Sequence, residues 1–144
     1  MVRGRWLPAA RLTAMRDSLA ARYAPRRAEV LRFDSLVTAG RLDDAAVTLR
    51  ALRRAHAGGP PIAQIVMWVK ARRRLVTDTA GAVRLLEWNA DMYPQSHSTH
   101  AELARAYLLM GDTIRARAEA RRALAIFPTH EAALDVLRRT GPRF

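Results

Sequence analysis

Similar residues recur at a separation of 34 positions, and this spacing constrains the fold more than any other feature of the sequence. Ala82 and Ala116 are 34 residues apart, and so are Pro94 and Pro128. Within each copy the apolar residues follow helical spacing, and a proline marks the end. The pattern predicts one pair of helices, written twice between Val69 and Pro128.

The second copy carries the small and large apolar residues that a tight helical hairpin requires. Small side chains stand where two helices have to approach closely, at Ala104, Ala116 and Ala123. Leu103 and Tyr107 are the large residues that fill the remaining space between the helices. We therefore expect Tyr107 to be a core residue.

A Gly-Asp pair divides the second copy into its two helices. Gly111 tolerates the left-handed backbone conformation at a helix end, and Asp112 accepts hydrogen bonds from the free N–H groups of the next helix. The stretch 39–46 resembles this turn around Gly40, which predicts a third, degenerate hairpin. The matching turn of the first copy, Thr77-Asp78-Thr79, lacks the glycine.

These residues, at their 34-residue period, resemble the tetratricopeptide repeat (TPR). The resemblance implies an all-α fold, a right-handed α-solenoid of about three TPR-like hairpins with a capping helix at each end. We expect a basic N-terminal helix over 1–25, which is a cap or the remnant of a preceding unit, then a repeat domain over 26–140 and a tail over 141–144. The alternative is an antiparallel helix pair of another kind, which does not predict the repeated spacing.

Apolar periodicity and helix-ending residues place eight helices along the chain. The first begins near Pro8 and stops at Pro25, and the next two cover about 27–40 and 43–55. The next two cover about 62–75 and 80–92, the sixth begins near 96 and ends before Gly111, and the last two cover about 113–126 and 129–139. Ser96 is the preferred start of the sixth helix, and Thr99 is the alternative.

Composition excludes several classes of protein. The chain has 144 residues, half of them apolar, and no cysteine, which excludes disulfides and thiolate metal sites. No apolar run approaches the roughly 20 residues of a membrane span, and no apolar stretch follows the basic N-terminus as in a secretory signal. We therefore expect a cytoplasmic protein with no membrane partner.

The formal net charge of +12 favours nucleic acid or an acidic protein as the partner. The arginines are nevertheless dispersed in pairs such as Arg121-Arg122 and Arg138-Arg139, which is typical of solvated helix faces. Trp68 and Trp88 are expected to pack between the fourth and fifth helices, with an aromatic platform for bases as the alternative. A basic helical nucleic-acid-binding protein is thus a competing hypothesis.

Few residues of the chain are suited to chemistry. His97 and His100 could share a helix face, but two histidines without a third ligand seldom bind a metal, and their place at a helix start favours an exposed cap. Asp43-Asp44 suit a helix start, where negative charge is stabilised. No serine lies in a Gly-x-Ser-x-Gly elbow, and there is no glycine-rich phosphate loop. The sequence predicts no catalysis, no metal and no cofactor.

In TPR solenoids the first helix of each hairpin lines the inner groove, and the resemblance transfers this role to two helices here. The expected groove residues of one unit are Gln64, Met67, Ala71 and Arg74, and their counterparts are Ser98, Ala101, Arg105 and Leu108. The Lys and Asn arrangement with which some family members hold a peptide carboxylate is absent. Arg74 and Arg105 could still bind carboxylates through paired hydrogen bonds, so we expect an extended acidic segment as the ligand.

The run from Leu85 to Ser96, and the one from Glu102 to Asp112, are similar to runs in TPR tails appended to bacterial serine hydrolases of the beta-lactamase-like and alpha/beta types. The similarity covers about residues 84–125 and includes Asn89, where ordinary repeats prefer alanine. No part of a hydrolase active site is present, so the similarity implies an accessory C-terminal module. The leading interpretation is a non-catalytic scaffold that binds a protein or peptide; nucleic-acid binding and a hydrolase tail are the alternatives.

Overall fold

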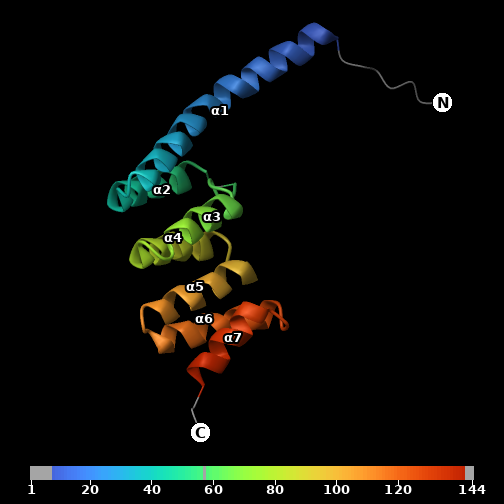
Figure 1. Cartoon of the computed structure of the whole chain (residues 1–144). Helices are drawn as coiled ribbons and strands as arrows, with labels where there is room; N and C mark the ends of the chain where they lie inside the picture. Colours follow the sequence, from blue (N-terminus) through green and yellow to red (C-terminus); the bar gives the residue numbers. More distant parts are fainter. Residues whose placement is uncertain (1–7, 57, 142–144) are drawn as a thin grey trace, which may run out of the picture. The chain divides into compact units, whose positions relative to one another are not determined.

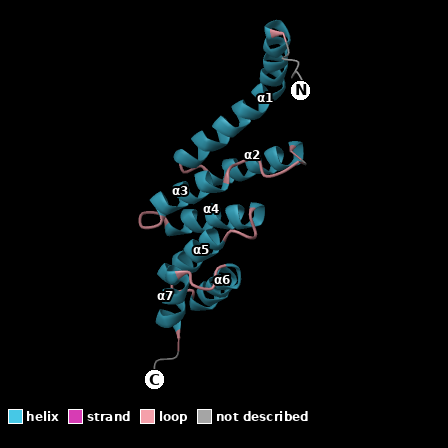
Figure 2. Ribbon diagram, turned by 90° about the vertical axis from the view of Figure 1, so that its right-hand side faces the viewer, coloured by secondary structure: helices cyan, strands magenta, loops and turns pink. Residues whose placement is uncertain are grey.

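The computed structural model describes residues 8–56 and 58–141, with the backbone alone for residues 22–25. Across these residues the chain forms seven α-helices and no strand, which confirms the all-α fold class (Figure 2). Trp6, the side chain of Tyr23 and the end of the tail lie outside the described residues. The chain divides into two compact units, Met1–Pro61 (unit 1) and Ile62–Phe144 (unit 2). No helix in the described ranges combines the length and hydropathy that crossing a membrane demands.

Unit 1 contains two helices, α1 (Ala9–Thr38) and α2 (Leu42–Ala55). The predicted helix end at Pro25 is wrong, because α1 runs through this position without a break. A proline removes a single backbone N–H, and the residues that follow it, Arg26, Arg27 and Ala28, favour helix strongly enough to continue the element. The expected domain boundary after residue 25 therefore falls inside a helix, and the division lies after Pro61 instead.

The turns at Gly40 and Gly111 have the same backbone geometry, which confirms that they are one kind of turn. Their φ angles are 76° and 78°, in the left-handed region that glycine adopts without strain. In both, the N–H of the residue after the glycine donates to the carbonyl five residues earlier, Arg41 to Leu36 and Asp112 to Tyr107, each at 2.9 Å. This is the Schellman arrangement, and it closes the helix end in each case.

Unit 2 consists of five helices, α3 (Gln64–Arg74), α4 (Thr79–Met92), α5 (His97–Leu109), α6 (Thr113–Ile126) and α7 (Glu131–Thr140). Each helix packs on the next, and α7 also contacts α5, so two hairpins are followed by a single covering helix (Figure 1). The predicted bounds hold to within a few residues. The side chain of Ser96 caps α5 by accepting from the Thr99 N–H, so Ser96 is the start and Thr99 is not.

The helices of unit 2 meet at alanines. Small side chains with no solvent exposure lie on all five helices, at Ala71, Ala82, Ala104, Ala106, Ala116, Ala120, Ala123 and Ala133. Tyr107 is buried among them, as predicted. Because a fully buried alanine leaves little room for a larger group, the packing of this unit is sensitive to added volume at these positions.

Ala116→Leu should lower the free energy of unfolding by about 1–3 kcal/mol, because added methyl groups have to displace close-packed neighbours. Ala118→Leu is the matched control on the exposed face of the same helix, and it should change stability by about 0.5 kcal/mol or less. Chemical denaturation followed by circular dichroism measures both. Equal stability of the two variants would contradict the packing of α6.

Candidate functional site

An open hollow of about 510 Å³ lies where α3 begins and where α4 passes into α5. Its walls are Gln64 and the continuous segment from Met92 to Ser98. Two of the predicted groove residues, Gln64 and Ser98, therefore border one depression. Its volume falls within the range of roughly 300–1,000 Å³ that is usual for ligand sites. We call this depression the α3–α5 hollow.

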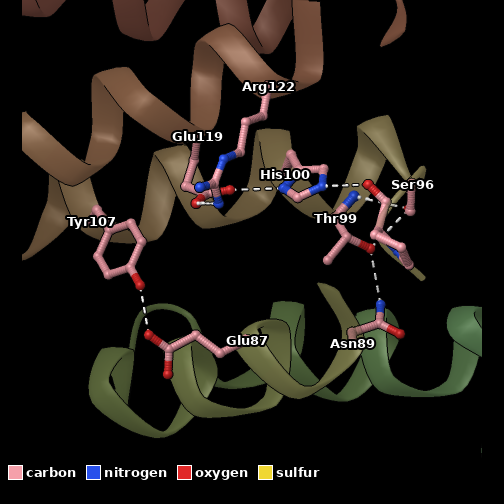
Figure 3. A network of polar contacts seen from close by, with 9 residues as sticks. Glu87, Asn89, Ser96, Thr99, His100, Tyr107, Glu119 and Arg122 are labelled. Carbon is pink, nitrogen blue, oxygen red and sulfur yellow. Dashed lines mark hydrogen bonds and ion pairs between the residues drawn. The ribbon is translucent and has the colours of Figure 1, made fainter. Parts of the chain in front are cut away.

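A buried network of hydrogen bonds centred on Thr99 adjoins the α3–α5 hollow, because Gln64 and Ser96 belong to both, and Figure 3 shows the bonds among Asn89, Ser96 and Thr99. The Asn89 amide donates to Thr99 Oγ1 at 2.9 Å, and the Ser96 and Thr99 hydroxyls are 2.9 Å apart. The Gln64 amide donates to Ser96 Oγ at 2.7 Å. Asn89 and Thr99 have no solvent exposure, so these bonds pair the buried Asn89 Nδ2 and the Thr99 hydroxyl, while the buried Asn89 Oδ1 has no partner among the described residues. The network joins α3, α4 and α5.

A second hollow of about 390 Å³ lies on the other side of the same loop, and Pro94 and Gln95 border both. Its other walls are His100 on α5 and Arg122, Ala125 and Ile126 on α6. Two hydrogen bonds hold the loop between the hollows. The Tyr93 hydroxyl donates to the Ile62 carbonyl at 2.8 Å, and His100 Nε2 lies 2.9 Å from the Pro94 carbonyl.

His100 is buried with acceptors on both sides of its ring. Nδ1 lies 2.7 Å from Glu119 Oε2, and Nε2 faces the Pro94 carbonyl. Arg122 donates to the other Glu119 oxygen at 2.8 Å. A neutral imidazole can donate only one hydrogen bond, so this geometry calls for the doubly protonated ring. The hydrogen bond to Glu119 is the main cause that raises the pKa of His100 above 6.5, against the opposing effect of burial.

Tyr107 ties α5 to α4 and α6. Its hydroxyl donates to Glu87 Oε1 at 2.6 Å, and the Arg115 guanidinium lies 4.6 Å from the centre of its ring (Figure 3). Burial, followed by the hydrogen bond to Glu87, raises the pKa of Tyr107 to about 12. The tyrosine therefore keeps its proton at physiological pH and acts as a structural donor.

The two histidines of α5 point to different places, so the expectation that both belong to an exposed cap is wrong for His100. The His97 ring packs against Phe127 and His130, with ring centres 5.1 and 5.2 Å away. His100 contacts Glu119 instead. Among the described residues, no group of three or more His, Cys, Asp or Glu side chains is placed to hold a metal ion.

The predicted groove residues divide into three groups. Met67 is fully buried, as are Ala71 and Ala101, so these belong to the core and we remove Met67 from the groove. Gln64 and Ser98 line the hollow. Arg74 bonds to Asp78 at 3.1 Å across the α3–α4 turn, whereas Arg105 is exposed and Leu108 is half-buried. None of these three residues lines the α3–α5 hollow, and the prediction that one ligand contacts both Arg74 and Arg105 stays a prediction.

Arg72, rather than Arg74, is the α3 arginine that pairs with a carboxylate of α5. Its Nε lies 3.6 Å from Glu102 Oε1, which links α3 to α5 directly. The same guanidinium lies 4.7 Å from the centre of the Trp68 ring, and Arg84 lies 5.5 Å from that of Trp88. Because an arginine already covers one face of each tryptophan, a platform for stacked bases is disfavoured.

Inspection of the helix faces could have found the buried polar residues that the sequence analysis missed. His100 stands four residues before Ala104 and seven before Tyr107, so it shares the face predicted as core. Glu119 lies three residues after Ala116 and four before Ala123, so it shares the core face of the next helix. A histidine and a carboxylate on the apolar faces of two neighbouring helices indicate a buried pair. The sequence contained this signal.

Comparison with protein-family models and with curated proteins finds no match to this sequence. The function therefore has to be argued from the geometry of the hollows and from charge.

The free energy of unfolding should fall as the pH rises through the raised pKa of His100. The folded state favours the imidazolium, so its contribution is complete below pH 6.5 and disappears once the ring loses its proton in the folded chain. Thermal melts between pH 5 and about 9 measure this dependence. His100→Gln should flatten it, whereas His56→Gln, which removes a histidine of unit 1, should not. An unchanged pH dependence in His100→Gln would contradict the assignment.

Proposed function

We propose that unit 2 is a non-catalytic, TPR-like scaffold that binds an extended peptide segment of a partner protein in the α3–α5 hollow. The observation that carries the proposal is that α3 and α5, the first helices of successive hairpins, border one open depression. Gln64 to Ser96 and Arg72 to Glu102 bridge the two helices. A surface built from the first helices of successive hairpins is the peptide-binding surface of this class of solenoid.

The lining of the α3–α5 hollow suits a peptide backbone. It combines amide and hydroxyl groups of Gln64, Gln95 and Ser98 with the apolar surface of Met92 and Pro94. Such a mixture provides hydrogen bonds to peptide groups together with burial of a side chain. The net charge of +12 steers acidic segments toward the chain, which supports an acidic peptide over a basic one.

The hydrogen bonds of the Ser96 hydroxyl at the hollow support a non-catalytic binding role. Ser96 Oγ accepts from Gln64 and from the Thr99 N–H, so it serves as a helix cap. Among the described lining residues there is no carboxylate to orient His97 as a general base. The similarity to the tails of serine hydrolases stays a prediction, and it is compatible with a binding role.

Peptides selected from a displayed random library against the full chain test the proposal. Filling the hollow by Ser98→Tyr should weaken the selected peptides at least about tenfold, a loss of about 1.4 kcal/mol. Ala118→Tyr, on the exposed face of α6 outside the hollow, should leave affinity unchanged. Fluorescence anisotropy measures both.

Two outcomes would count against peptide binding in the hollow. Equal affinity of the peptides for the Ser98→Tyr and Ala118→Tyr variants would place their site elsewhere. Failure to select any peptide, together with salt-sensitive binding of an oligonucleotide, would favour the nucleic-acid hypothesis.

A further inference from the structure

One stripe of α1 carries apolar side chains that no described residue of unit 1 buries. Leu12, Met15 and Leu19 are 50%, 55% and 42% exposed, and every described side chain from Pro8 to Ala21 is exposed. The three residues follow one another at steps of three and four, so they share one face of the helix. We call Leu12, Met15 and Leu19 the α1 stripe.

The α1 stripe shares a heptad register with the interface between α1 and α2, but Arg22, Arg26 and Glu29 occupy the positions between them, so the stripe is a separate apolar patch. Phe33 stands two heptads after Leu19 and three after Leu12, so it lies on the same face, and it is buried where α1 packs on α2. At about 1.5 Å per residue, the 30 residues of α1 extend about 45 Å and the 14 of α2 about 21 Å. The second helix can therefore cover only about half of the first, and the half of α1 that carries the stripe is long enough to bind a further short helix.

Arginines border the α1 stripe on both sides. With Leu12, Met15 and Leu19 at the a, d and a positions of a heptad, Arg11 occupies g and Arg16 occupies e. Charges at e and g meet those of a partner helix and select it by sign. Arg16 bonds to its neighbour Asp17 at 2.9 Å, but both side chains are mostly exposed, so this weak pair exchanges readily for another carboxylate.

We propose that residues 9–21 of α1 bind an acidic amphipathic helix of a partner protein. The partner helix lays its own apolar stripe on Leu12, Met15 and Leu19 and pairs carboxylates with Arg11 and Arg16. A second copy of α1 is disfavoured, since it would set arginines against arginines along both edges of the seam. This site lies in unit 1, and it does not depend on the peptide-binding function proposed for unit 2.

A designed helical peptide of about three heptads, with Leu at a and d and Glu at e and g, is the probe. A second peptide with Lys in place of Glu is its matched control, and like charges at the edges keep either peptide from pairing with itself. Anisotropy titration of the full chain should show that the Glu peptide binds at least about tenfold more tightly than the Lys peptide. The double variant Arg11→Glu, Arg16→Glu should reverse this preference.

The triple variant Leu12→Ser, Met15→Ser, Leu19→Ser should lose the Glu peptide and keep the melting temperature of the parent, because these side chains are exposed. Val47→Ser, which changes an exposed apolar residue of α2, should leave binding intact. Equal affinity for the two peptides, or binding that survives the triple variant, overturns the proposal. Two other results would also overturn it if the Glu peptide does not bind. They are dimerisation of the chain in sedimentation and attachment of the chain to vesicles of anionic lipid, where the triple variant abolishes either one.

Discussion

The buried hydroxyl of Thr99 is the interaction on which the arrangement around the α3–α5 hollow depends. It accepts from Asn89 on α4, meets the Ser96 hydroxyl at the start of α5, and lies 3.4 Å from the Gln64 amide on α3. A buried polar group is costly unless it is paired, so sliding one helix past another would leave several such groups unpaired at once. The apolar alanines allow the helices to come close, and the polar network selects one register among the close-packed alternatives.

Two hydrogen bonds at adjacent residues hold the loop between the two hollows near its α4 end. The Tyr93 hydroxyl donates to the Ile62 carbonyl, and the protonated His100 holds the Pro94 carbonyl while it pairs with Glu119. A loop that is already ordered loses less conformational entropy when a ligand binds. A ligand bound in the α3–α5 hollow, as proposed, would therefore meet a loop that is already held in place.

Local signals in the sequence were sufficient for most of the fold of unit 2. Glycine at 111, aspartate at 78 and 112 and serine at 96 determine where helices end and begin, because each acts through its own backbone neighbourhood. The helix end predicted at Pro25 was wrong because one local signal was given too much weight. The single missing hydrogen bond does not outweigh the helical preference of the residues that follow Pro25. The site was harder to predict: the direction of Arg74 toward Asp78, and the pairing of His100 with Glu119, depend on which side chains meet across helices.

A double-mutant cycle of Asn89→Ala and Thr99→Val, measured by the free energy of unfolding, tests the role of the Thr99 network most directly. Thr99→Val removes the hydroxyl and keeps the shape, so the cycle isolates the hydrogen bond between α4 and α5. We predict a coupling energy of at least about 0.5 kcal/mol, the lower end for residues in one network. Effects that add to within about 0.3 kcal/mol would show that the two residues act independently, and would contradict the central role of the Thr99 hydroxyl.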